Sequence, residues 1–202
     1  MKNHLMLLVG VLAVVGLISL SSCGPKEFTK GEYDDPTRVE LLDDKFNEAD
    51  MQTMSETIVK AMIDCPAIKE AKKKPTVIMD RVQNRTEEHI DTKSMTDKIR
   101  TALIKSGKVR FVNREERETL EGEYAHNESG AVSRETMKKR GKQIGSDYIF
   151  NGAMATNIQQ MGNDKFIYYK LTMNLTNTEE STIDCTEERE VRKKYRKQSV
   201  GL

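Results

Sequence analysis

The stretch Phe166-Ile167-Tyr168-Tyr169-Lys170-Leu171-Thr172-Met173-Asn174-Leu175 decides the fold of this chain. It is rich in the residue types that favour strands, and turn signals bound it on both sides. The stronger signal is Gly162-Asn163, within a turn over about 160–164, and the second turn covers residues 177–179. We therefore predict a strand over 166–175 with a strand before it and another after it.

The two neighbouring strands are predicted over about 147–156 and 181–185. All three lie so close together in the sequence that an antiparallel meander is the simplest arrangement. Residues 186–197 mix glutamates with several arginines and lysines, and we expect a charged tail there.

Helical and strand-like segments alternate before the meander. Apolar residues recur at helical spacing in the first of them. The expected elements are a helix over 47–64, a strand over 76–82, a helix over 92–106, a strand over 109–112, a charged helix over 114–120, a polar loop over 124–130 and a helix from Ser133 to about Gly145. Together these elements indicate an α+β domain in which helices flank a small, mostly antiparallel sheet.

The first 23 residues carry the parts of an export signal. One lysine precedes an apolar run that ends at Leu20, and Ser21, Ser22 and Cys23 follow. A cysteine in this position resembles that of the bacterial lipobox, where the thiol is acylated and becomes the mature N-terminus. The alternative is an uncleaved membrane anchor, but the run is slightly short for a span of about 20 residues. We predict a signal peptide over 1–22 and lipidation of Cys23.

Residues 23–46 are predicted to be the lipidated N-terminus and a disordered, flexible tether. Apolar residues are sparse in this segment and show no period. The globular domain is then expected over 47–202, and its length suits one domain.

The charge balance bears on the class of partner. Without Lys2 the chain has 32 basic and 32 acidic side chains, so the mature protein is close to neutral. A protein that binds nucleic acid through bulk positive charge is therefore not expected.

Two cysteines remain once Cys23 is lipidated. Cys65 and Cys185 would lie in an oxidising compartment, where a disulfide is possible. A disulfide needs Cα atoms within about 7 Å of each other, and the sequence gives no sign of that proximity. We therefore expect two buried free thiols and keep the disulfide as the alternative.

Catalytic and ligand-binding patterns are lacking in the sequence. His89 and His126 lie in polar segments without a helical partner suited to zinc. Nucleophile elbows, phosphate loops and dinucleotide fingerprints do not occur. We expect neither an enzyme nor a bound metal or cofactor.

Four segments resemble elements of the LpoB family, outer-membrane lipoproteins that activate bifunctional penicillin-binding proteins. They are RVQNRT at 81–86, FVNREER at 111–117, GKQIGSDYIFNG at 141–152 and IDCTEEREVRK at 183–193. Two departures stand near one edge of the predicted sheet. Cys185 occupies a position where the family usually has Trp, and Glu179 a position where it has Gly.

The resemblance implies that the domain docks on a noncatalytic part of a class A penicillin-binding protein. It would stimulate glycan polymerisation and crosslinking as a monomer, from an outer-membrane anchor that faces the periplasm. The alternative function is a structural subunit of an envelope assembly or secretion complex, similar to the CsgG type, which would form a ring or oligomer.

A basic run beside the best-matched segment is the expected binding surface. Four cations crowd a short stretch predicted to be helical, and Asn151 belongs to the matched segment itself. The predicted binding residues are Lys138, Lys139, Arg140, Lys142 and Asn151. A merely solvated helix face is the alternative, because exposed charges usually contribute little.

Overall fold

The computed structural model describes residues 31, 34–35, 38–41 and 43–197. The chain divides into a unit over Met1–Asp35 and a unit over Pro36–Leu202, and the second holds the folded domain. The predicted signal peptide, Cys23 and most of the predicted tether lie outside the described residues. None of the helices in the described part is long and apolar enough to cross a membrane.

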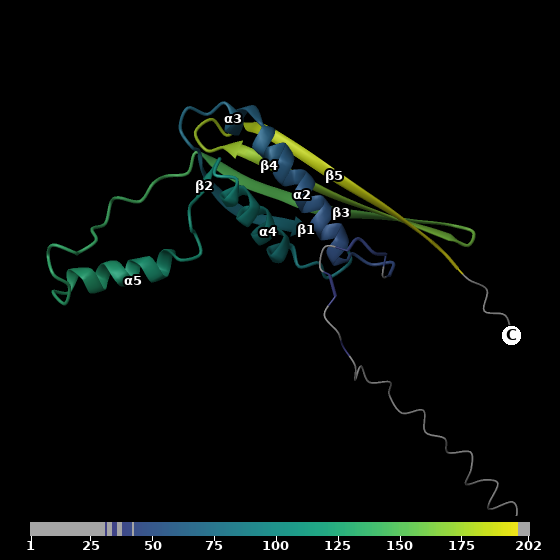
Figure 1. Cartoon of the computed structure of the whole chain (residues 1–202), viewed down its shortest axis with the longest axis horizontal. Coiled ribbons are helices and arrows are strands. Elements are labelled where there is room, and N and C mark those ends of the chain that lie inside the picture. Colours follow the sequence, from purple (N-terminus) through teal and green to yellow (C-terminus); the bar gives the residue numbers. More distant parts are fainter. Residues whose placement is uncertain (1–30, 32–33, 36–37, 42, 198–202) are drawn as a thin grey trace, which may run out of the picture. The chain divides into compact units, whose positions relative to one another are not determined.

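A five-stranded sheet forms the centre of the domain (Figure 1), with the strand order β2-β1-β3-β4-β5. Its central strand β3 pairs in parallel with β1 and antiparallel with β4, which in turn pairs antiparallel with β5. The strands are β1 Thr76–Asn84, β2 Arg110–Phe111, β3 Tyr148–Met161, β4 Asp164–Asn177 and β5 Ile183–Arg196. The predicted α+β class and the antiparallel meander are confirmed.

The meander is longer than predicted. The β3–β4 hairpin turns at Gly162, whose φ of 60° suits glycine. The expected charged tail over 186–197 is wrong, because β5 pairs with β4 along almost its whole length. Val191 and Tyr195 pack against the core, whereas most charged side chains of β5 remain exposed. One face of this strand is solvated, so its charges do not oppose pairing.

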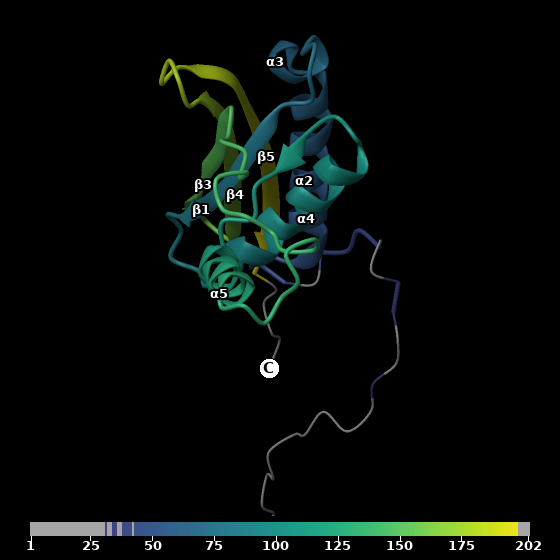
Figure 2. The ribbon, with the colours of Figure 1, turned by 90° about the vertical axis from the view of Figure 1, so that its left-hand side faces the viewer.

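Two helices cover one face of the sheet (Figure 2). They are α2, Glu48–Asp64, and α4, Thr92–Lys105, and the short α3, Pro66–Lys69, follows α2. Asn47 and Asp50 form a capping box that begins α2. Methionines and aliphatic residues fill the space between helices and sheet, with Met54, Ile58, Met95, Ile99, Met154 and Leu171 fully buried.

The connection between β2 and β3 differs from the prediction. The helix α5 covers Arg117–Glu128, so the loop predicted over 124–130 is mostly helical. The helix predicted from Ser133 to Gly145 does not form. Only one turn closes after Ser133, and Gly141 takes a φ of 80° that a helix cannot continue. This segment has little apolar surface to bury, so tertiary packing does not stabilise a helix.

Cys65 and Cys185 form a disulfide, and the expectation of two free thiols is wrong. The bond joins the residue between α2 and α3 to β5, with the two Cα atoms 6.3 Å apart. Cys185 lies opposite Leu175 in the β4–β5 ladder, on the face that the helices cover. A strand over 181–185 was predicted, but the sequence pattern did not reveal that the end of α2 lies beside this strand and brings Cys65 to Cys185.

The last residues of the predicted tether pack on the domain. The ring of Phe46 meets the ring of Tyr169 edge to face with centroids 5.4 Å apart, and the backbone N–H of Phe46 donates to the Glu88 carboxylate. Lys165 forms an ion pair with Asp44 at 2.6 Å, and this hydrogen bond holds the pKa of the Asp44 carboxyl below its usual value. The folded domain therefore begins by about Asp43, slightly before the predicted start at 47.

Replacing Gly152 by alanine is expected to destabilise the sheet by about 1–3 kcal/mol, the usual range for overpacking a well-packed core. A Cβ at this position would come far inside van der Waals contact with the Thr172 carbonyl oxygen and the Met173 sulfur. Urea unfolding measures the change. Ala153→Ser, on the opposite face of the same strand, is the control and should leave the midpoint nearly unchanged.

Candidate partner-binding site

Two of the family-like segments meet beside the N-terminal end of α4. The segment 81–86 contains the end of β1, and the segment 111–117 is the loop that leaves β2. Between them lies a hollow of about 350 Å³, lined by Met79, Asp80, Arg81, Thr92, Lys93, Thr96, Arg100, Arg114 and Glu115. The lining carries four cations and two carboxylates, so this is a charged surface rather than an apolar pocket.

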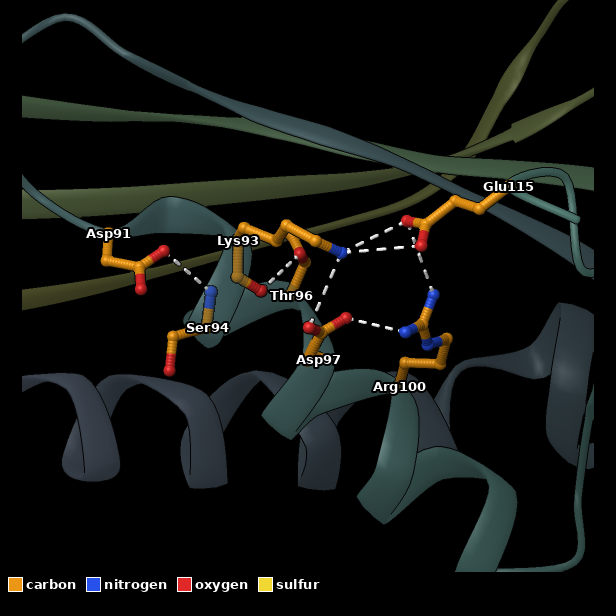
Figure 3. Close-up of polar contacts among 7 residues, drawn as sticks. All are labelled: Asp91, Lys93, Ser94, Thr96, Asp97, Arg100 and Glu115. Atoms are coloured by element: carbon orange, nitrogen blue, oxygen red, sulfur yellow. Dashed lines mark hydrogen bonds and ion pairs between the residues drawn. The ribbon is translucent and has the colours of Figure 1, made fainter.

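A network of ion pairs fixes one wall of this hollow (Figure 3). Glu115 accepts from Lys93 at 3.2 Å and lies 4.0 Å from Arg100. Asp97 pairs with the same two cations, at 3.6 Å and 2.6 Å. The hydrogen bond to Glu115 and the charge of Asp97 raise the pKa of the Lys93 ammonium. Such exposed pairs contribute little stability, but the network attaches the loop after β2 to α4.

Helix capping orients the residues of α4 that carry this network. Asp91 accepts a hydrogen bond of 2.9 Å from the backbone N–H of Ser94 and so begins the helix. Thr96 donates from its hydroxyl to the Lys93 carbonyl oxygen at 2.8 Å and is itself buried. The first turn of α4 is therefore well defined, and Lys93 faces the loop that carries Glu115 (Figure 3).

Arg81 and Arg114 also line the hollow. Arg114 pairs with Asp80 at 3.6 Å. Arg81 is exposed and, among the described residues, has no side-chain hydrogen bond or ion pair. A guanidinium with all its donors free, beside others already paired, is available to bind a carboxylate.

A second hollow of about 460 Å³ lies on the sheet face opposite α2 and α4, and Arg81 lines it as well. Asn151 of β3 is half-buried in this hollow, opposite Asn174 of β4. The structure thus places Asn151, a predicted binding residue, on an open polar surface continuous with the charged one.

The structure places the four predicted cations in the segment between α5 and β3, which is not helical. Arg140 is paired with Glu121 at 3.2 Å and Glu128 at 3.4 Å, and its guanidinium lies 5.7 Å from the ring centre of Tyr124. These contacts tie Arg140 to α5. The lining of the hollow that contains Asn151 includes none of the four cations.

The remaining three cations of the run are exposed. Lys138 donates its backbone N–H to Asn127 of α5 at 3.1 Å. Within the described chain, the side chains of Lys138, Lys139 and Lys142 make no hydrogen bond or ion pair. These three lysines therefore keep an unpaired charge, and only Arg140 of the predicted run is paired.

The surface cations Arg81, Lys93, Arg100 and Arg114 were not singled out from the sequence as binding residues. Arg81 and Arg114 stand inside the family-like segments, which was the available signal. Their proximity depends on the parallel pairing of β1 with β2, which brings the two segments together. In the described part of the chain, no cluster of His, Cys, Asp or Glu is arranged to hold a metal ion.

Comparison with known proteins identifies a family whose model matches this chain. The family model described as "Peptidoglycan-synthase activator LpoB" matches residues 50–191, more than half of the chain. Comparison with the curated proteins gives no match.

Solved structures match the chain as well, among them the following three. The LpoB C-terminal domain of Salmonella enterica has 17% sequence identity and a TM-score of 0.44, covering 70% of this chain and 98% of that one. The same domain of Escherichia coli has 16% identity and a TM-score of 0.43, with the same coverage. The PelC dodecamer of Paraburkholderia phytofirmans has 12% identity and a TM-score of 0.29, covering 65% and 78%. Because the family model spans the helices and the sheet from α2 into β5, the chain belongs to the LpoB family of peptidoglycan-synthase activators.

Proposed function

We propose that this protein is a lipoprotein, anchored through Cys23 in the outer membrane, whose periplasmic domain binds and stimulates a class A penicillin-binding protein. The observation that carries the proposal is the family match over residues 50–191, which covers the charged surface described above. The domain acts as a monomer and performs no chemistry itself. Its contribution is binding energy that favours the active state of the synthase.

Asn151 is proposed as a separate contact, because none of the four predicted cations lines the hollow in which it lies, and Arg81 lines both this hollow and the one beside α4. The main contact surface is the predicted basic run, of which Lys138, Lys139 and Lys142 are the free members. Such a surface favours an acidic patch on the synthase and accelerates encounter more than it strengthens the final complex.

Exchanging Lys139 and Lys142 for glutamate is expected to slow association with the synthase about tenfold at low salt, because attraction becomes repulsion. Biolayer interferometry with the immobilised synthase measures the association rate at several salt concentrations. Fold stability should change by less than about 0.5 kcal/mol, since both side chains are exposed.

The matched control is Lys72→Glu with Lys74→Glu, which makes the same change in net charge on the exposed stretch between α3 and β1. Arg140 is left intact because its pairs with α5 would confound the result. If both double variants associate at the same rate, the basic run is not part of the contact surface.

A further inference from the structure

A groove runs along β3 on the sheet face that the helices leave uncovered. Its floor is formed by Ala153 and Ala155, whose small side chains leave the space open. One wall comes from β1 and the other from β4. Ala153 of the floor pairs with Gln83 of β1 on one side and with Thr172 of β4 on the other. The wall residues are Arg81, Gln83, Arg85, Lys170, Thr172 and Asn174. Since the walls stand two strand spacings apart, the groove is about 10 Å wide.

The groove offers mainly hydrogen-bond donors. Arg81, Asn151 and Thr172 have no side-chain hydrogen bond among the residues that the structure describes. Asn174 accepts from the Thr186 hydroxyl at 2.7 Å, which leaves its amide group free to donate outward. Gln83 accepts two hydrogen bonds from Arg85, the shorter of 2.9 Å, and so holds that guanidinium at the rim.

The charge of the groove is positive. Arg81, Arg85 and Lys170 line it, and its one carboxylate, Asp80, is paired with Arg114 at 3.6 Å. Lys170 has a distant partner in Glu188 at 3.7 Å, with both side chains largely exposed. A complementary ligand carries carboxylates and carbonyl acceptors at intervals along an extended chain.

We propose that this groove binds a glycan strand of peptidoglycan, with the N-acetyl carbonyls on the amide side chains and the stem-peptide carboxylates on the cations. A sugar ring can lie on the methyl groups of Ala153 and Ala155, where no larger side chain intervenes. The choice of this polymer rests on the proposed function, which places the domain beside the enzyme that makes it.

An extended peptide is a poorer occupant of the same groove. A peptide strand added to a sheet gains affinity by pairing its backbone with a free edge. The floor strand β3 is hydrogen-bonded to β1 on one side and to β4 on the other, so it has no free edge along the groove. The lack of a free edge does not weaken the binding of a glycan, because a glycan needs only side-chain donors and a flat floor.

The test is co-sedimentation of the full chain, held in detergent, with purified protein-free sacculi. Wild-type protein is expected to pellet with the sacculi, and soluble glycan strands should release it. Ala153→Leu fills the floor and is expected to raise the half-saturating amount of sacculi at least tenfold. The matched control, Asn157→Leu, lies on the same face of β3 outside the groove and should bind like wild type.

Thermal unfolding of both variants checks that neither result reflects loss of the fold. The proposal is overturned if wild-type protein stays in the supernatant, or if Ala153→Leu binds as well as Asn157→Leu. Release by a polyglutamate peptide at the same carboxylate concentration, but not by glycan strands, would also overturn it in favour of an acidic protein partner. Because no synthase is present, these failures leave the proposed activation of the synthase standing.

Discussion

Replacing Cys65 and Cys185 together by alanine is expected to lower the free energy of unfolding by about 4–5 kcal/mol, the loop-closure value for a bond that joins distant residues. The two cysteines are 120 residues apart, and the closed loop contains all of β1 to β4. Without the bond the unfolded chain gains the freedom of that whole segment. Alanine is preferred to serine because Cys65 is buried and a hydroxyl there would need a partner.

Urea unfolding of the oxidised wild type, the reduced wild type and the double variant measures this effect. Reduced wild type and variant should unfold at similar, much lower urea concentrations. A shift of less than about 1 kcal/mol would mean that the unfolded chain retains structure that already holds these segments together.

Exchanging Asp50 for asparagine is expected to cost about 3–5 kcal/mol, the usual penalty for leaving one partner of a buried ion pair without the other. The Lys193 ammonium lies 2.6 Å from the Asp50 carboxylate, and both side chains are almost completely buried. Lys193 also donates to the Lys45 carbonyl oxygen at 2.6 Å, and no other cation in the described part of the chain bonds to that oxygen. Asparagine at position 50 can still accept a hydrogen bond from the backbone N–H of Asn47, the N-cap of α2, so the lost charge accounts for most of the change.

The reverse exchange, Lys193→Met, is expected to cost less than Asp50→Asn. The carboxylate of Asp50 still accepts from the Asn47 N–H at 2.9 Å and lies in the first turn of α2, where the helix dipole favours negative charge. A double-mutant cycle with thermal unfolding measures the coupling. Equal losses of stability for the two exchanges would show that the hydrogen bond from Asn47 and the helix dipole do not stabilise the Asp50 carboxylate.

The sequence predicts those parts of the fold whose pattern is local. The helix α2 shows its apolar spacing and its boundary at Pro66, and the β3–β4 hairpin shows Gly162-Asn163. The length of β5 is different, because a strand was predicted only over 181–185 and the residues that follow are mostly charged. Its continuation to Arg196 depends on pairing with β4 along almost the whole strand.

The candidate site shows the same limit. Asn151 and the basic run could be chosen from the sequence because they stand in or near a recognisable segment. The sequence does not show which of these cations remain unpaired. Arg140 is paired with two glutamates of α5, a helix that extends beyond its predicted end. The groove along β3 depends on three strands meeting in register, and sequence spacing alone does not fix that register.

Activation of a synthase is measured as the rate of glycan polymerisation by each class A penicillin-binding protein of the cell of origin, with and without the protein in detergent. Labelled lipid-linked precursor reports the rate, and heat-unfolded, reduced protein serves as the control. We expect at least one synthase to polymerise several-fold faster with the folded protein and to be unaffected by the control. An unchanged rate for every synthase would show that the protein is not a synthase activator.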